Sequence, residues 1–153
     1  MLDAVVVDDP FSLSRFVRAQ DAHGTFEQAV QELREGRKRS HWMWFVFPQL
    51  EGLGRSPAAQ LYAVSGLAEA RAYLDHPVLG PRLHEAVQAL LDLDAADPVA
   101  VLGGIDAVKL RSSMTLFEAA APEEPAFGQV LDRYYRGERD EQTLTGLRGP
   151  GRG

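Results

Sequence analysis

Residues 77–91 read Pro-Val-Leu-Gly-Pro-Arg-Leu-His-Glu-Ala-Val-Gln-Ala-Leu-Leu, and this stretch decides the fold class. Its apolar side chains recur at the i, i+3, i+4 and i+7 spacing that places them on one face of a helix. They are Leu83, Ala86, Val87, Leu90 and Leu91. Pro77 and Pro81 precede them, as is typical of the start of a helix. The stretch therefore predicts an amphipathic helix whose apolar face lies in a core.

Helical patterns continue on both sides of this stretch. Residues 25–35 predict a helix that starts after Gly24 and ends at Gly36, and residues 127–135 match the same apolar spacing at five positions. Further helices are expected at five other start signals. The segment that follows Ser56 should form two short helices, which Gly66 separates. These signals are Asp9-Pro10, Ser56, Asp97-Pro98, Asp106 (with a stop at Pro122) and Asp140.

Strand patterns, fixed-period repeats and linkers are absent from the sequence. The expected fold class is therefore all-α, with short helices in one compact domain over residues 9–147. A chain of this length buries roughly 70% of the surface that its unfolded form exposes, which is enough for a core. We expect a flexible N-terminus at residues 1–8 and a disordered tail at residues 148–153, which are mostly glycine and arginine.

Composition narrows the class of protein further. The sequence has no cysteine, which excludes disulfides, thiolate metal sites and cysteine nucleophiles. The N-terminus lacks the basic region and long apolar core of a signal peptide, and no segment approaches the roughly 20 apolar residues of a membrane span. The expected location is the cytoplasm, without a membrane partner.

Charge is distributed unevenly along the chain. The net charge is −6, but residues 34–39 alone carry +3. Duplex-binding proteins usually present a wide basic face, because affinity grows with the number of phosphates that they neutralise. One short basic cluster on an acidic chain suits a single small anion, and nucleic acid is not an expected partner.

Residues 37–50 depart from the helical pattern and read Arg-Lys-Arg-Ser-His-Trp-Met-Trp-Phe-Val-Phe-Pro-Gln-Leu. This string places both tryptophans beside the densest positive charge, and its spacing leaves open whether it is helical or extended. In a functional interpretation, the cations neutralise an anionic group, His41 carries a proton and Trp44 offers a flat surface to a ring. In a structural interpretation, most of the aromatic side chains are core and the cations are solvated.

Residues 108–117 contain a second unusual string, Val-Lys-Leu-Arg-Ser-Ser-Met-Thr-Leu-Phe. On a helix, the apolar stripe of Leu110 lies roughly opposite a stripe of small residues that contains Ser112 and Thr115, so this helix should be central. Lys109 and Arg111 then need anionic partners, because an unpaired buried charge is costly. Those partners are either acids of the protein, with the hydroxyls bonded back to the helix, or an anionic ligand.

Familiar catalytic motifs are missing. The four histidines have no compact ligand spacing, so we expect no metal. Neither a glycine-rich phosphate loop nor a GxSxG serine occurs. We expect no cofactor, and the sequence assigns no reaction.

Both strings, Lys38–Gln49 and Lys109–Phe117, resemble the signatures of an uncharacterised family, the domain of unknown function DUF1810. The resemblance extends over about residues 8–147 and includes Asp9-Pro10-Phe11, His76-Pro77 and Leu79-Gly80. It implies a mainly helical fold in which short helices pack as a small right-handed superhelical array. It brings no catalytic assignment.

Our leading hypothesis is a site for a small anionic ligand, nucleotide-like or phosphorylated, built from both strings. His41 is its candidate catalytic residue, because an imidazole exchanges protons near neutral pH. The alternative is an interaction module whose helical groove binds an acidic peptide or a partner helix. In a third interpretation, both strings serve only internal packing and ion pairs. This interpretation requires that the cations are paired with Asp or Glu and that no cavity lies near them. The proposed ligand-binding residues are Lys38, Arg39, Trp44, Gln49, Lys109, Arg111, Ser112 and Thr115.

Overall fold

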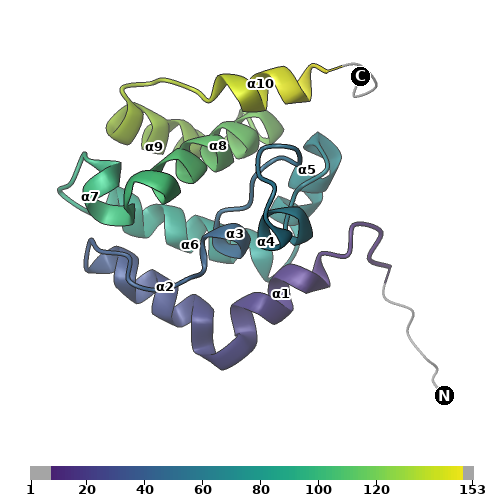
Figure 1. Cartoon of the computed structure of the whole chain (residues 1–153), viewed down its shortest axis with the longest axis horizontal. Helices are drawn as coiled ribbons and strands as arrows, with labels where there is room; N and C mark the ends of the chain where they lie inside the picture. The colour runs from purple at the N-terminus through teal and green to yellow at the C-terminus, as the bar shows by residue number, and fades with distance from the viewer. Residues whose placement is uncertain (1–7, 150–153) are drawn as a thin grey trace.

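Helices dominate the computed structural model, which describes residues 8–149 (Figure 1). Within these residues, ten α-helices and one short 3-10 helix enclose one hydrophobic core, and extended backbone pairs only at an isolated parallel bridge between Leu50 and Val64. The predicted all-α class is confirmed, whereas the right-handed superhelical arrangement stays a prediction. The flexible and disordered ends that the sequence predicts lie mostly outside the described residues, at 1–7 and 150–153.

Helix α6 (Leu79–Leu91) is the amphipathic helix that residues 77–91 predict, and its apolar face is buried except for Leu91, which is half-buried. Gly80, in its first turn, allows a close helix contact. A Cβ atom at Gly80 would lie 2.1 Å from the carbonyl oxygen of Leu74 in the neighbouring helix α5. Helix α6 packs against α2 (Thr25–Arg34), α5 (Leu67–Asp75) and α9 (Pro125–Tyr135).

Helix α8 (Gly104–Ala120) runs through the middle of the fold, as its two stripes predict (Figure 1). The stripe through Leu110 and Phe117 is completely buried, and Ser112 and Thr115 are buried on the other side. This double burial requires covering helices on several sides. They are α5, α7 (Pro98–Leu102), α9 and α10 (Glu141–Leu147).

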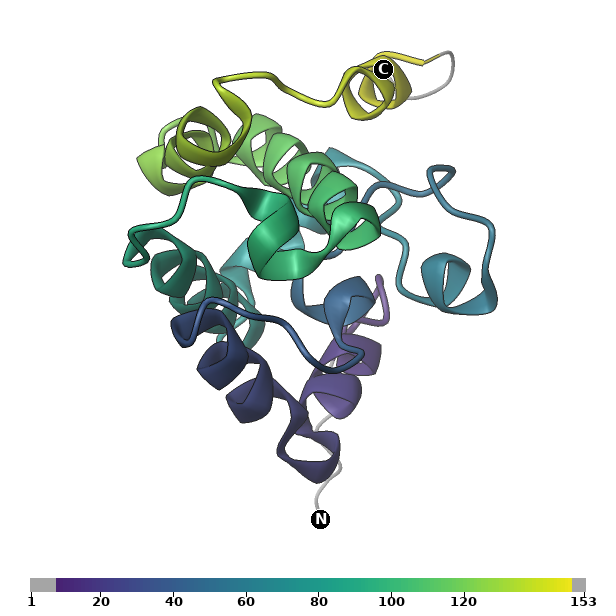
Figure 2. The same cartoon turned by 60° about the vertical axis from the view of Figure 1, so that its left-hand side comes forward.

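The N-terminal part supplies the remaining helices. Figure 2 shows the long connection that precedes α4 projecting beside α8, with α10 at the same side of the molecule. This arrangement brings two segments that are distant in sequence, the connection before α4 and the start of α10, to the first half of α8. The remaining helices are α1 (Ser14–Asp21), the 3-10 helix (Ala22–Gly24), α3 (Met43–Val46) and α4 (Pro57–Leu61).

Two helix starts differ from the sequence prediction. Helix α1 begins at Ser14 and not directly after Asp9, because Ser12 adopts a left-handed conformation with φ 54° that interrupts the helix. The Asp9 carboxylate still accepts hydrogen bonds from the backbone at the helix start. Helix α8 begins after Gly103, so the prediction that Asp106 caps this helix is wrong, and Asp106 lies inside its first turn.

Candidate functional site

A buried carboxylate holds the basic and aromatic string against α2. Glu32 is completely buried and accepts hydrogen bonds from the backbone N–H groups of Arg39 and Ser40 and from the indole of Trp42. The hydroxyl of Ser40 and the amide of Gln28 donate to its other oxygen. Burial raises the pKa of Glu32, but these hydrogen bonds outweigh burial and lower it to about 2. Trp42 is therefore part of the core.

The two lysines of the sequence, Lys38 and Lys109, meet at one carboxylate. Lys38 Nζ lies 2.9 Å from Oδ2 of Asp106, and Lys109 Nζ lies 3.2 Å from Oδ1. Each ammonium also lies over an indole, with Lys38 Nζ 5.0 Å from the ring centroid of Trp42 and Lys109 Nζ 4.2 Å from that of Trp44. These are cation–π distances. The lysine–aspartate cluster (Lys38, Asp106 and Lys109) thus joins the two strings that the sequence singles out.

Beside this cluster, Trp44 and Lys109 line a pocket of about 530 Å³, which we call the Trp44 pocket. One wall comes from the connection before α4 and from α4 itself, and the facing wall comes from the first turns of α8. Trp44 follows the buried Trp42 by two positions, so the anchoring of the string to α2 also positions the pocket. The polar side chains of its lining are Gln49, Arg55, Ser56 and Lys109.

Apolar side chains complete the pocket, and two of them are largely exposed to solvent. Ile105 is 77% exposed and Val108 is 57% exposed, both on the first turns of α8. Leu53 and Ala59 lie on the other wall, which the connection before α4 and α4 itself form. A ligand in this pocket would therefore contact both charged and apolar surface.

The lining is positively charged, although the whole chain carries −6. Asp106 bears one negative charge and contacts two ammonium groups, so Lys38 suffices to neutralise it. Lys109 keeps an unbalanced positive charge, and one hydrogen bond to Asp106 occupies one of its three N–H donors. Arg55 adds a second cation on the wall that the connection before α4 forms. This electrostatic environment favours an anion.

Three of the predicted site residues on the first string lie outside the pocket lining, and of these only Lys38 is connected to it, through Asp106 and Lys109. Arg39 pairs with Glu35 at the surface, with 2.7 Å between Nη2 and Oε1. His41 is exposed and does not belong to the pocket lining. The structure therefore brings Lys38, Trp44, Gln49 and Lys109 together and leaves Arg39 and His41 apart from them.

On the second string, Arg111 faces a different hollow, next to the residues that precede α10. Two positions along a helix correspond to roughly 160° around its axis, so Lys109 and Arg111 point to different sides. Ser112 and Thr115 donate their hydroxyl hydrogens to backbone carbonyls one turn earlier, at 3.2 and 2.8 Å. The structure matches the back-bonding interpretation for these two residues.

Sequence reasoning misses three residues that build this region, Glu32, Arg55 and Asp106. The spacing of Asp106 and Lys109, three positions apart on a helix, is a signal that identifies their ion pair. No local signal connects Glu32 to the backbone of the string, because that contact depends on the turn after α2.

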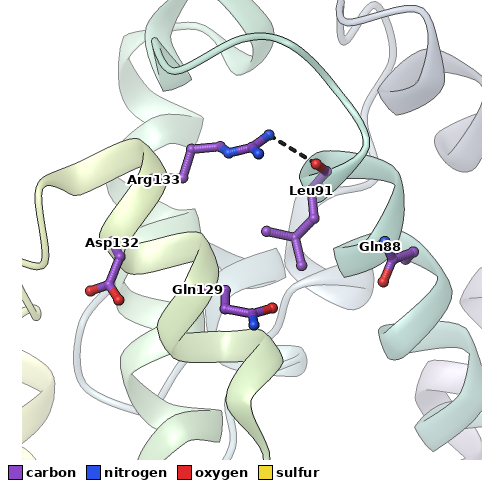
Figure 3. A pocket seen from close by; sticks show the side chains of 5 residues that line it. All are labelled: Gln88, Leu91, Gln129, Asp132 and Arg133. Carbon is purple, nitrogen blue, oxygen red and sulfur yellow. Dashed lines mark hydrogen bonds between the residues drawn. The ribbon is translucent and has the colours of Figure 1, made fainter.

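Another hollow of about 510 Å³ lies between α6 and α9 (Figure 3). Its cation, Arg133, donates hydrogen bonds to the carbonyls of Leu91 and Leu93 and so caps the end of α6. The amide of Gln88 is bonded to Asp92. Because its polar groups serve the fold, this hollow is a weaker candidate site than the Trp44 pocket.

Two general features of residues 8–149 bear on function. Their helices are too short or too polar to cross a bilayer. They also bring together no group of three or more histidine, aspartate or glutamate side chains with the geometry of a metal site.

Comparisons with known proteins identify one family and one similar solved structure. The family model described as "Protein of unknown function (DUF1810)" matches residues 10–147. The crystal structure of the conserved hypothetical protein Rv1873 from Mycobacterium tuberculosis is similar, with a TM-score of 0.88 and 48% sequence identity. The match covers 92% of this chain and 99% of that chain. No curated protein matches the sequence.

Proposed function

This chain belongs to the DUF1810 family, whose description names no activity, and we propose that it binds a small phosphorylated or nucleotide-like ligand in the Trp44 pocket. The observation that carries the proposal is the lysine–aspartate cluster. Because Lys38 and Lys109 share the single charge of Asp106, the ammonium of Lys109 carries a positive charge that a further anion would balance. That anion would come from the ligand.

The rest of the lining supports an anion attached to an apolar or ring-shaped group. Arg55 supplies a fork of N–H donors that matches the geometry of phosphate or carboxylate oxygens. Gln49 and Ser56 offer neutral donors and acceptors, while Ile105 and Val108 offer apolar contact. Small-molecule sites commonly combine a few polar groups with mostly apolar walls. As the sequence predicts, we place this function in the cytoplasm.

The two tryptophans make the proposal directly testable by NMR. The ¹H–¹⁵N spectrum should show two indole signals, which a Trp44→Phe variant assigns. Addition of inorganic phosphate or adenosine monophosphate should shift the Trp44 signal and leave that of Trp42, which is buried and bonded to Glu32. We expect dissociation constants of about millimolar or below.

Lys109→Gln should weaken this binding by about tenfold or more, because it removes the unbalanced charge. Arg34→Gln is the matched control, since Arg34 is exposed and makes a long ion pair with Glu85 on another face. Equal binding by the wild type and Lys109→Gln, or an unmoved Trp44 signal with both anions, would show that the pocket is not an anion site.

One observation favours the alternative of an interaction module. Ile105 and Val108 expose large apolar side chains at the pocket, and exposed apolar surface often marks a protein interface. In that case a double Ile105→Ser and Val108→Ser variant should abolish binding of an acidic amphipathic helical peptide. The small-ligand proposal expects the same variant to keep phosphate binding within about twofold of the wild type.

A further inference from the structure

The Trp44 pocket is one of three hollows that share lining residues. A second hollow of about 610 Å³, between the connection before α4 and helix α10, shares Leu53 and Arg55 with it. A third, of about 540 Å³, shares Val108 with the Trp44 pocket and shares Glu141 and Gln142 with the second. The three hollows therefore adjoin one another where the connection before α4, helix α8 and helix α10 meet, and we call them together the α8 groove. This groove exceeds the space that one anionic group requires.

Arg111 lines the third hollow with a guanidinium that makes no hydrogen bond to any residue of the described range 8–149. Its Nη2 lies 3.7 Å from Oδ1 of Asp140, and its Nη1 lies 3.9 Å from Oε1 of Glu138. Both distances exceed those of a hydrogen bond. Its Nε is buried without a partner. Arg139 in the same hollow differs, because it binds Glu118 through two nitrogens.

The neighbouring acids leave room for another acceptor. Oδ2 of Asp140 accepts hydrogen bonds from the backbone and the hydroxyl of Thr143, so this carboxylate is held at the start of α10. Glu138 is 75% exposed, and an exposed pair of this kind contributes little. An incoming anion can displace the exposed Glu138 contact and use the open N–H donors of Arg111, in competition with the carboxylates of Asp140 and Glu141 that also line this hollow.

We propose that the ligand of the Trp44 pocket has a second anionic group, which Arg111 binds in the third hollow. This inference rests on the proposed function, because the first anionic group lies at Lys109 and Arg55. Between the two positions lies Val108, which is 57% exposed and lines both hollows. The ligand class is an elongated molecule with two phosphate-like ends and an apolar middle.

A series of alkyl phosphonates tests this geometry. Alkane bisphosphonates from ethane to octane are compared with monophosphonates of equal length, and the Trp44 indole signal reports binding. A bisphosphonate that reaches both cations gains from the effective concentration of its second group. We expect one chain length at which the bisphosphonate binds at least about tenfold more tightly than the monophosphonate, with weaker binding at shorter and longer lengths.

Arg111→Gln should remove this advantage and leave monophosphonate binding within about twofold of the wild type. Lys109→Gln should weaken both ligands. Arg111→Lys, which keeps the charge, is the second variant and should keep part of the advantage, and Arg34→Gln is the control. If monophosphonates bind but bisphosphonates show no advantage, or if the advantage survives in Arg111→Gln, the second site is wrong while the proposed function stands. If neither ligand binds, both fail.

Discussion

Replacement of Glu32 with glutamine should destabilise the protein by about 3 kcal/mol at neutral pH. The carboxylate is completely buried and accepts five hydrogen bonds, most of them from the string that leads to the Trp44 pocket. Glutamine has nearly the same shape but no charge, and its NH₂ group would face two donors. The variant therefore removes the charge-assisted hydrogen bonds without creating a large cavity.

The expected loss of stability follows from the pKa of Glu32. Burial raises this pKa, but the hydrogen bonds outweigh burial and lower it from the ordinary 4.5 to about 2. A difference of about 2.5 pKa units corresponds to about 3 kcal/mol. Because the folded-state pKa is the lower one, this stability is complete above about pH 5 and is lost as the pH falls toward 2. The difference between wild type and Glu32→Gln should therefore shrink to about 1.5 kcal/mol at pH 3.

Urea unfolding at pH 7 and pH 3, followed by tryptophan fluorescence, measures the loss of unfolding free energy at each pH. In thermal unfolding at pH 7, the melting temperature should fall by about 6–12 °C for a chain of this length. Glu35→Gln is the control on the same turn, since Glu35 is 44% exposed and pairs with Arg39 at the surface, and its unfolding midpoint should stay near that of the wild type. A cost in Glu32→Gln below about 1 kcal/mol, or an equal cost at both pH values, would refute the reasoning.

Two further variants test the packing. Gly80→Ala should cost at least about 2 kcal/mol, because the added methyl would lie 2.1 Å from the carbonyl oxygen of Leu74. Gly104→Ala, with no atom within 4 Å, should be neutral or slightly stabilising in the same urea experiment, and equal stabilities would contradict the close approach of α5 and α6. Arg15→Lys should cost about 2 kcal/mol, since the Arg15 guanidinium donates five hydrogen bonds to four carbonyls and to Glu69. An unchanged urea midpoint for Arg15→Lys would show that charge alone matters there.

The helices themselves were predictable because amphipathic spacing is a local property. The apolar face of residues 83–91 forms α6, Gly24 and Gly36 bracket α2, and Asp140 caps α10 through its carboxylate. The two stripes of residues 108–121 correctly predict that α8 is central. The first helix is predicted, but it starts later than expected because Ser12 is left-handed, and no residue type signals that conformation there.

The candidate site was only partly predictable. Both strings stand out in the sequence, but the sequence leaves open which of their residues meet. The structure joins Lys38, Trp44 and Lys109 through Asp106, turns Arg111 to another hollow and leaves His41 exposed at the surface. The close combination of cationic and aromatic side chains in the strings can be recognised from the sequence alone, because it involves only residues that are neighbours along the chain.

Only the tertiary structure decides which cations keep a free charge. Lys38 and Asp106 are far apart in sequence. Their ion pair forms because α2, α7 and α8 pack so that the first string passes the start of α8. There the backbone N–H of Lys38 donates a hydrogen bond to the carbonyl of Val101. Glu32 fixes that position of the string from within α2. Electrostatic pairing depends on distances through space, and periodicity along the chain does not encode them.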